Sequence, residues 1–415
     1  MNRSGNKLAI NGGVAAIAHS LPKRNLIGED ERAAVLELID NSIRSGDPIR
    51  YNGKYEEEYT LKFVNFMGGG YADGVNSGTN AFFSALGALD IEPGSEVIVP
   101  SITDVGGISP VFFHSLIPVI SDVSNNSYNI SAEEIELLIT DKTRAIVVAH
   151  ISGEPADMNP IMELANRYNL KVIEDCAQSH GAEYNGKKVG TIGDISFFST
   201  MPGKHHCTGG QGGVVFSNSK NLIEKSKMFS DRGKEFKDGV FTGNNIIAGL
   251  NCNMDELSAS IGCVQIEKLP DIISKTHKIG EFIKLELCKK NSILSISDQP
   301  KGSKCVYWFL RLKIDLSKLT VNKQTFVSAL HAEGVPVSSE YRSTPYSQPF
   351  YEDSLKRSRM VTDDQIRSLT RKDRYPNVEN ALHNHINIFI RENYSDNDVK
   401  SILSAIEKVE NFYKI

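Results

Sequence analysis

Between about residues 27 and 270, short apolar segments alternate along the chain with segments of helical spacing. The apolar segments have the length and composition of buried strands and lie at residues 95–101, 117–123, 143–151, 170–178, 194–200 and 212–218. The segments with helical spacing lie at residues 28–46, 79–91, 131–139 and 159–169. Strands that alternate with helices form a mostly parallel sheet covered on both faces. The sequence therefore predicts an α/β fold with a mixed, mostly parallel sheet flanked by helices.

The pattern changes near residue 254, where two helical segments follow one another, 254–269 and 272–287. Pro270 separates them, and we expect it to divide two helices because proline lacks the N–H that a helix interior needs. Beyond them come a predicted strand, a predicted helix, a polar region and a last amphipathic helix, at residues 305–314, 322–334, 345–378 and 397–414. We expect a large domain at residues 1–269 and a smaller C-terminal α+β domain at residues 270–415.

Composition limits the class of protein. The chain has 415 residues, 40% of them hydrophobic and 23% charged, and a net charge of -5. These values are typical of a globular protein and do not indicate a partner among nucleic acids or membranes. The six cysteines are scattered without a C-x-x-C pair, which argues against a structural metal site and a disulfide framework. With no signal-peptide pattern at the N-terminus, we expect a reduced, cytoplasmic compartment.

Small residues precede a predicted helix in "GVNSGTNAFF". Ser77, Gly78 and Thr79 would expose backbone N–H groups at the positive end of the helix dipole, which suits a phosphate. The same residues are also an ordinary N-cap, and the motif alone favours that reading.

Asp175 ends a predicted strand in "VIEDCAQSHGA", and Gln178 follows three residues later. A buried carboxylate needs a positively charged partner, and a protonated pyridine nitrogen would serve. The alternative is a strand-end aspartate that caps the next helix.

The stretch "FFSTMPGKHHCTGGQGG" combines Ser199, Lys204 and His205 with many glycines. Taken alone, the stretch favours a turn between strands over a catalytic segment. Asn251 lies ahead of a helix in "GLNCNMDELSASIG", where an asparagine is most often an N-cap.

Together and in this order, the clusters resemble the DegT/DnrJ/EryC1/StrS family. The resemblance extends over most of the chain and is most specific in "VIEDCAQSHGAEYNGKKVGTIGDISFFS" and the lysine segment after it. It implies a sugar aminotransferase that uses pyridoxal 5'-phosphate (PLP) and has fold type I, the fold of aspartate aminotransferase.

The resemblance also implies roles for individual residues. Lys204 follows the family pattern F-S-x-x-P-G-K and is the expected Schiff-base lysine and catalytic base. Asp175 is expected to pair with the pyridine nitrogen and Gln178 to contact the ring. Ser199 and the backbone of Gly78 and Thr79, with Ser77 beside them, are expected to bind the phosphate. By the same resemblance, Asn251 reaches the phosphate of a neighbouring subunit, so the working unit is a homodimer.

Three positions depart from the family pattern. Asp104 stands at a cofactor-binding position where relatives often carry an aromatic residue that stacks on PLP. Ser152 replaces the tyrosine of H-x-Y-G, and Asn253 stands where many relatives carry arginine. These changes indicate a substrate that differs from those of the best-known members.

The expected reaction moves an amino group from glutamate or glutamine to a keto sugar, most simply a nucleotide-linked keto-deoxy sugar. A keto-cyclitol or keto-octulosonate acceptor is an alternative. A sugar 3-dehydratase that uses His205 as its base, and a non-catalytic protein of the same fold, are less favoured because Lys204 stands at the reactive position. Tyr341 and Arg342, with His205, are the predicted substrate contacts.

Overall fold

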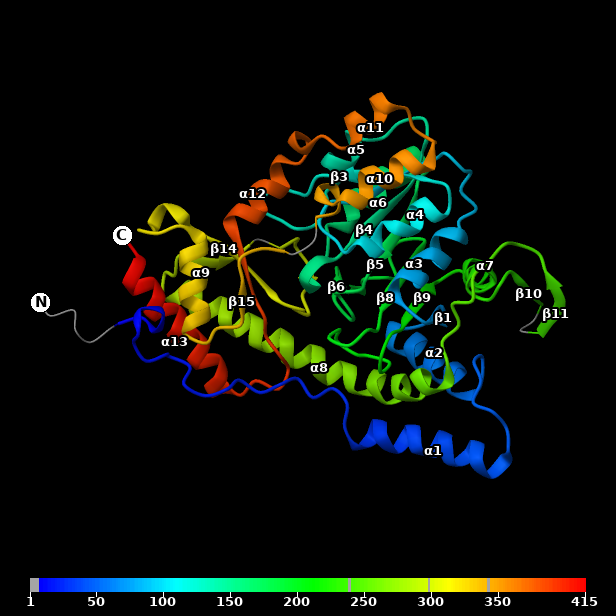
Figure 1. Cartoon of the computed structure of the whole chain (residues 1–415), viewed down its shortest axis with the longest axis horizontal. Coiled ribbons are helices and arrows are strands. Elements are labelled where there is room, and N and C mark those ends of the chain that lie inside the picture. Colours follow the sequence, from blue (N-terminus) through cyan, green and yellow to red (C-terminus); the bar gives the residue numbers. More distant parts are fainter. Residues whose placement is uncertain (1–6, 238–239, 298, 342–343) are drawn as a thin grey trace, which may run out of the picture.

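The computed structural model describes residues 7–237, 240–297, 299–341 and 344–415. A seven-stranded sheet forms its centre, in the order β1-β9-β8-β5-β4-β2-β3 (Figure 1). Its strands are β1 (Tyr71–Val75), β2 (Glu96–Pro100), β3 (Ile117–Ser121), β4 (Thr143–Ala149), β5 (Lys171–Asp175), β8 (Ile195–Ser199) and β9 (Gly213–Ser217). Neighbouring strands are parallel from β3 to β8, and β9 is antiparallel to both β8 and β1. The predicted α/β fold is confirmed.

Apolar strands are covered by helices because both faces of a buried parallel sheet must be removed from water. Every residue of β3 and of β9 is buried. The helices of this part are α1 (Glu29–Ser45), α2 (Lys54–Met67), α3 (Gly78–Gly87), α4 (Ser109–Phe113), α5 (Ala132–Glu136), α6 (Met158–Tyr168) and α7 (Lys220–Ser230). Helix α1 lies at the periphery, against α8, and exposes Ile43 (Figure 1).

A second, antiparallel sheet lies toward the C-terminus in the order β12-β14-β16-β15. Its strands are β12 (Leu294–Ile296), β14 (Leu310–Ile314), β15 (Val337–Ser338) and β16 (His385–Ile388), and its helices are α9 (Lys323–Ala332) and α13 (Asp396–Tyr413). Phe326, Ile386 and Ile402 form part of its core, together with Leu8 and Ile17 from the start of the chain. The smaller lobe is therefore built from both ends of the described sequence.

One helix, α8 (Glu256–Lys289), replaces the two helices predicted on either side of Pro270. The prediction of a break was wrong because tertiary packing outweighs the loss of one N–H donor. Leu269 is buried in the core of the large sheet, and Leu287 is buried in the core of the small one. The predicted domain boundary at 269/270 falls inside this helix.

The polar region 345–378, for which no element was predicted, is largely helical. It contains α10 (Pro349–Ser358) and α11 (Asp363–Leu369) and leads into α12 (Pro376–Asn384). Tyr351 and Val378 pack into the core of the large sheet. The large core thus also draws on residues beyond 270.

The remaining strands form two small sheets away from the centre. One joins β6 (Glu183–Tyr184), β7 (Lys187–Lys188) and β13 (Ser303–Lys304), and the other is the hairpin of β10 (Lys234–Lys237) and β11 (Val240–Asn245). Every residue of β11 is exposed, and the hairpin projects from the body of the molecule (Figure 1). Among the residues described here, no helix is long and apolar enough to cross a bilayer.

Candidate active site

A cavity of about 300 Å³ lies where strands of the large sheet end. Strands β1, β2, β5 and β8 run in the same direction, so the residues that follow them meet at one edge, where open α/β sheets bind ligands. The cavity brings together predicted site residues that are far apart in the sequence: Ser77, Gly78, Thr79, Asp104, Asp175, Gln178, Ser199, Lys204 and Tyr341.

The start of α3 forms one end of this cavity. Ser77 is the N-cap, and its hydroxyl accepts the N–H of Asn80 at 3.1 Å, so the capping alternative is correct for its side chain. A Cβ on Gly78 would lie 2.6 Å from Cβ of Ser199, which means that only glycine allows α3 to approach β8 this closely. The backbone N–H groups at this helix end remain suited to an anion.

Asp175 stands at the end of β5 with 7% of its surface exposed. One carboxylate oxygen accepts the N–H of Ala177 at 3.0 Å, and the other has only a 3.5 Å contact with the Thr103 hydroxyl. Burial raises the pKa of Asp175, opposed mainly by that backbone bond and by Lys204. A cationic ligand nitrogen beside this oxygen would keep the carboxylate ionised.

Gln178 joins two segments at the cavity that are far apart in the sequence. Its Oε1 accepts the N–H of Ser152 at 2.9 Å, and its Nε2 donates to the hydroxyl of Tyr341 at 2.8 Å. Tyr341 was predicted as a substrate contact, and the structure places it in the wall of the cavity. Arg342, its predicted companion, lies outside the described residues.

Lys204 lies in the loop between β8 and β9 and is 7% exposed. Burial lowers the pKa of its amine to about 8, although the charges of Asp175 and Asp104 act to raise it. Its Nζ lies 4.2 Å from the centroid of the Trp308 ring. A buried lysine with a depressed pKa is the form of this side chain that acts as a nucleophile or base near neutral pH.

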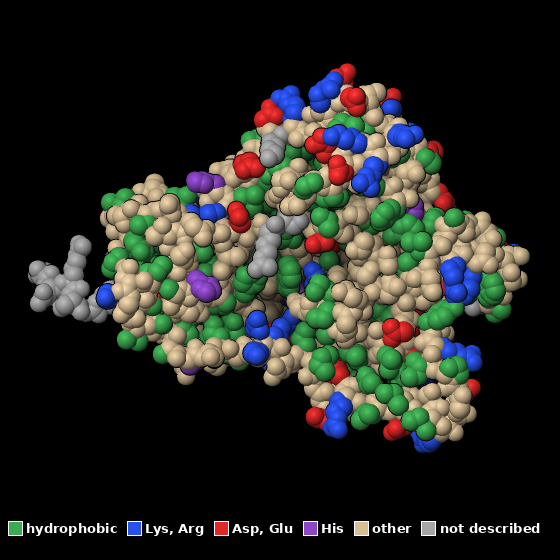
Figure 2. All heavy atoms as spheres, viewed as in Figure 1, with side chains coloured by type: hydrophobic (Ala, Val, Ile, Leu, Met, Phe, Trp, Pro, Cys, Tyr) green, Lys and Arg blue, Asp and Glu red, His purple; other side chains and the backbone are tan. Residues whose placement is uncertain are grey.

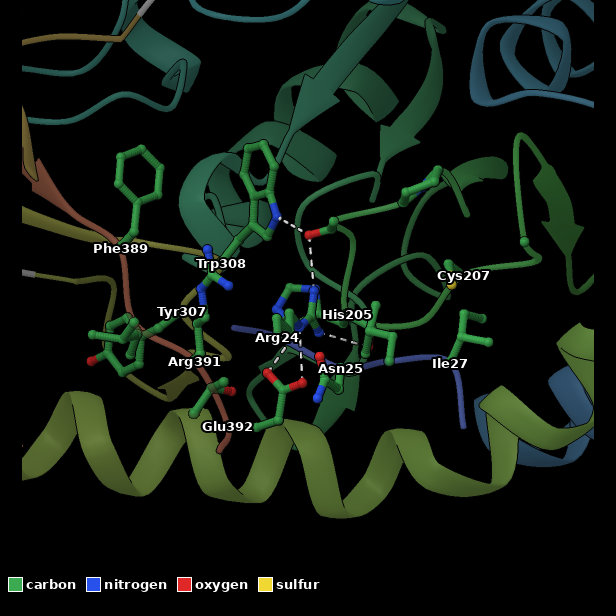
Figure 3. A pocket seen from close by; sticks show the side chains of 16 residues that line it. Arg24, Asn25, Ile27, His205, Cys207, Tyr307, Trp308, Phe389, Arg391 and Glu392 are labelled. Atoms are coloured by element: carbon green, nitrogen blue, oxygen red, sulfur yellow. Dashed lines mark hydrogen bonds and ion pairs between the residues drawn. The ribbon is translucent and has the colours of Figure 1, made fainter. Parts of the chain in front are cut away.

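Two residues that the sequence reasoning missed hold the lysine loop. The indole Nε1 of Trp308 donates to the carbonyl of Gly203 at 2.8 Å. Arg24 donates to three consecutive carbonyls, those of Gly203 at 3.0 Å, Lys204 at 2.5 Å and His205 at 3.0 Å. Its Nε also pairs with the Glu392 carboxylate at 2.8 and 2.9 Å (Figure 3). The only available signal was that Trp308 is the one tryptophan of the chain.

His205 is buried and lines a second, neighbouring cavity rather than the one that contains Lys204. Burial lowers its pKa to about 3, so it is neutral near pH 7. His206 is engaged in the protein interior, with Nε2 2.8 Å from the Tyr59 hydroxyl and Nδ1 2.9 Å from Nδ1 of His180.

Two other predicted cofactor residues occupy more peripheral positions. The Asp104 carboxylate accepts the N–H of Gly106 at 2.9 Å at the rim of the cavity, where it presents charge instead of an aromatic face. Asn251 lies outside this cavity, and its side chain accepts a bond from Asn253 at 2.9 Å. The N-cap of α8 is Asp255, so the capping alternative for Asn251 was wrong.

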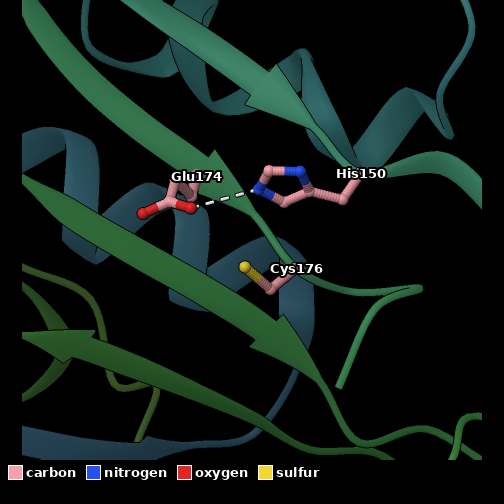
Figure 4. A group of neighbouring side chains, drawn as sticks. All are labelled: His150, Glu174 and Cys176. Atoms are coloured by element: carbon pink, nitrogen blue, oxygen red, sulfur yellow. Dashed lines mark hydrogen bonds and ion pairs between the residues drawn. The ribbon is translucent and has the colours of Figure 1, made fainter. Parts of the chain in front are cut away.

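A buried pair behind Asp175 fixes the ends of β4 and β5 (Figure 4). The Glu174 carboxylate accepts bonds from His150 Nε2 at 3.1 Å and from the N–H groups of Gly190, Ile192 and Gly193 at 2.7, 2.8 and 2.6 Å. Burial acts to raise the pKa of Glu174, but these donors hold it below its ordinary value. His150 Nδ1 accepts the N–H of Ala156 at 3.0 Å, so the hydrogen-bonding atoms of both side chains are already engaged and cannot serve a metal.

The model of the DegT/DnrJ/EryC1/StrS aminotransferase family matches residues 27–407. The chain belongs to this family. It is 31% identical over 366 residues to a GDP-perosamine synthase of Escherichia coli O157:H7, an alignment that covers 88% of this chain and 96% of that protein.

Solved structures show the same fold. An aminotransferase from Psychrobacter cryohalolentis is 29% identical with a TM-score of 0.82, over 95% of this chain and 99% of that one. NtdA of Bacillus subtilis, solved with bound cofactor PMP, has a TM-score of 0.77 at 23% identity, over 93% of this chain and 83% of that one. The protein is a sugar aminotransferase of the DegT/DnrJ/EryC1/StrS family, and its cofactor is PLP.

The residues present fit that cofactor. The cavity offers a helix N-terminus for a phosphate, a buried carboxylate for a ring nitrogen and an amine for a carbonyl. Glycine is required at several points of its wall, since a Cβ on Gly107 would lie 2.7 Å from Thr103 Oγ1 and 3.4 Å from Asp175 Oδ2. At Gly78 and Gly107 the backbone lies so close to neighbouring side chains that no larger residue fits in the wall.

Proposed function

We propose that this aminotransferase transfers an amino group from glutamate or glutamine to the keto carbon of a nucleotide-linked deoxy sugar. The observation that carries the proposal is the buried Lys204 amine, with its lowered pKa, in one cavity with Asp175 and the start of α3. The similarity to a GDP-perosamine synthase over almost all of that protein supports the nucleotide-linked acceptor.

Each side chain of the cavity has a role that follows from its position. Lys204 is the residue that would hold the cofactor through its Nζ, and its free amine would accept the proton from Cα of the amino donor. Bound PLP supplies the electron-accepting ring for that step. Asp175 would keep the ring nitrogen protonated, and Gln178 and Tyr341, which line the same cavity, would contact the bound molecules. Ser199 and the N–H groups at the start of α3 would hold the phosphate.

We also propose that the working unit is a homodimer, with Asn251 directed toward the site of a second copy. Its position outside this chain's own cavity and the exposed hairpin β10–β11 beside it support that arrangement. All six cysteines are free and five of them are buried, which supports a reducing, cytoplasmic setting.

The test is the visible absorption of the purified protein with PLP, recorded before and after glutamate or glutamine is added separately. The wild-type band should shift to shorter wavelength with the true donor. Lys204→Ala should abolish the band of lysine-bound cofactor, whereas Lys171→Ala, an exposed lysine paired with Asp194, should leave it unchanged.

A His205→Gln variant separates transfer from dehydration. It should keep the donor-induced shift, because His205 lies outside the Lys204 cavity and its pKa of about 3 makes it a weak base. If Lys204→Ala retained the spectral change and His205→Gln lost it, the dehydratase alternative would replace this proposal.

A further inference from the structure

Trp308 forms part of the wall of the cavity that contains Lys204. It is half-buried and lies just before β14, and two hydrogen bonds fix it. Its backbone N–H donates to the carbonyl of Ser152 at 2.8 Å, and its indole Nε1 donates to the carbonyl of Gly203 at 2.8 Å (Figure 3). Gly203 directly precedes Lys204 in the chain, so the indole is attached to the loop that carries the reactive amine.

The face of this indole lies against the Lys204 amine, with 4.2 Å between Nζ and the ring centroid. This distance is within the roughly 6 Å over which a cation is attracted to an aromatic face. Charged side chains are spread over the visible surface of the molecule (Figure 2), whereas Lys204 is 7% exposed. Within the described part of the chain, no hydrogen bond or ion pair holds Nζ, so the indole is the contact that defines its position.

The same cavity carries a carboxylate where relatives often have an aromatic residue that stacks on PLP. Asp104 stands at that position, and its carboxylate accepts the N–H of Gly106 at 2.9 Å. A carboxylate cannot stack on a flat ring. Any aromatic contact with the cofactor therefore comes from another segment of this chain.

Three aromatic side chains line the cavity, namely Phe197, Trp308 and Tyr341. Phe197 is stacked on Phe82 with 4.8 Å between the ring centroids and is 3% exposed, so its ring is already covered. Tyr341 packs edge-on against Tyr128, with 6.1 Å between the centroids. Of the three, Trp308 is the one that presents a ring face to Nζ.

We propose that Trp308 supplies the aromatic contact that position 104 lacks, with its indole face against the end of the cofactor that Lys204 holds. This inference rests on the proposed role of Lys204 and adds a residue to the cofactor site. A group bonded to Nζ lies one bond beyond an atom that already contacts the ring, so it lies within van der Waals reach of the indole. The bond from Nε1 to the Gly203 carbonyl keeps the ring beside the amine.

Two variants, Trp308→Phe and Trp308→Leu, separate this role from a purely structural one. Both remove the Nε1–H and its bond to Gly203, but only Trp308→Phe keeps an aromatic face. Trp308→Leu should weaken the affinity of the full-length apoprotein for PLP about tenfold, the order expected for one lost aromatic contact, and Trp308→Phe should stay within about threefold of wild type. Borohydride, which reduces the bond between lysine and cofactor, should act faster on Trp308→Leu than on the other two proteins.

The control is Tyr168→Leu, which removes a 43% exposed ring that contacts Arg167 and should leave the affinity for PLP unchanged. Trp308→Met repeats the test with a different apolar side chain, and thermal unfolding of each apoprotein identifies a variant that fails to fold. One measurement needs no substitution, because Trp308 is the only tryptophan of the chain. Its emission should lose most of its intensity when stoichiometric PLP is added to the wild-type apoprotein, and inorganic phosphate should leave it unchanged.

Three results would overturn the inference. Equal losses of affinity in Trp308→Phe and Trp308→Leu would show that the indole only anchors the loop. Wild-type affinity in Trp308→Leu, or tryptophan emission that PLP leaves unchanged, would show that the ring does not contact the cofactor. If the cofactor band responded to an amino donor while all three proteins bound PLP equally, this inference would fail and the aminotransfer would stand. Protection of the cofactor by the ring without a donor response would do the reverse.

Discussion

Replacing Arg24 by methionine tests whether the lysine loop is held from the start of the chain. The guanidinium forms a mostly buried ion pair with Glu392, with 14% and 13% of the two side chains exposed. It also satisfies the carbonyls of Gly203, Lys204 and His205. Removing one member of a buried pair costs about 3–5 kcal/mol, because the other charge is left without a partner. Hydrogen bonds to a charged donor contribute about 1.5–3 kcal/mol each, but bonds that share one guanidinium are not additive.

We therefore expect Arg24→Met to lower the free energy of unfolding by about 3–5 kcal/mol and to weaken PLP binding, since the loop that carries Lys204 loses its anchor. Denaturant unfolding and PLP titration of the apoprotein measure the two effects. The matched control is Arg32→Met, whose partner Glu29 and own side chain are 85% and 68% exposed. An exposed pair contributes about 0–1 kcal/mol, so this variant should be close to wild type.

Combining Arg24→Met with Glu392→Gln completes a double-mutant cycle. The double variant should lose less than the two single variants added together, because the second change removes the charge that the first leaves buried. The reasoning would be refuted if the free energy of unfolding of Arg24→Met were within about 1 kcal/mol of the wild-type value and its affinity for PLP were unchanged. A difference of about 1 kcal/mol is the most that an exposed ion pair contributes.

Three further predictions follow from single side chains. The rate at which PLP reconstitutes the apoprotein should rise with pH and level off above about 8, because the Lys204 amine reacts only when unprotonated; an ordinary lysine would show no plateau below pH 10. Gly78→Ala should weaken PLP binding at least tenfold, as its Cβ would lie 2.6 Å from Ser199 Cβ, whereas Gly210→Ala, with no atom within 4 Å, should bind PLP normally. Glu174→Gln should lower the free energy of unfolding at pH 7 by about 2–4 kcal/mol, since hydrogen bonds to a buried carboxylate are lost. Because the pKa of Glu174 is lowered by folding, that difference is fully present above about pH 4.3 and disappears as pH falls through the folded-state pKa, which unfolding at several pH values would show.

The parts of the site that local sequence determines were predictable. Asp175 and Ser199 end apolar strands, and Lys204 lies in the loop that follows one of them. Strand direction alone brings such residues to one edge of a parallel sheet. Hydrophobic period and glycine spacing are local signals, so they place these residues without knowledge of distant contacts.

The parts determined by contacts across the chain were not predictable. Arg24 and Glu392 are 368 positions apart, and neither lies in a motif. The continuity of α8 through Pro270 and the packing of α10 and α12 on the large core likewise depend on tertiary burial. Local propensity does not contain that information, and it gives the wrong answer at Pro270.

The reactivity of Lys204 depends on contacts between segments that are far apart in the sequence. The nearby charges of Asp175 and Asp104 both act to raise its pKa, so burial alone accounts for the lowering to about 8. Trp308, which stands over the amine, comes from the segment just before β14, and Arg24, which fixes the loop, comes from the start of the chain. The motif that identifies the lysine therefore does not by itself make it reactive. The packing of Trp308 and of the N-terminal segment around the lysine loop contributes to the burial that lowers the pKa of its amine. Asp104 stands at the rim in place of an aromatic residue, and its negative charge acts to raise the pKa of Lys204. Burial of the lysine must therefore be more complete to lower that pKa.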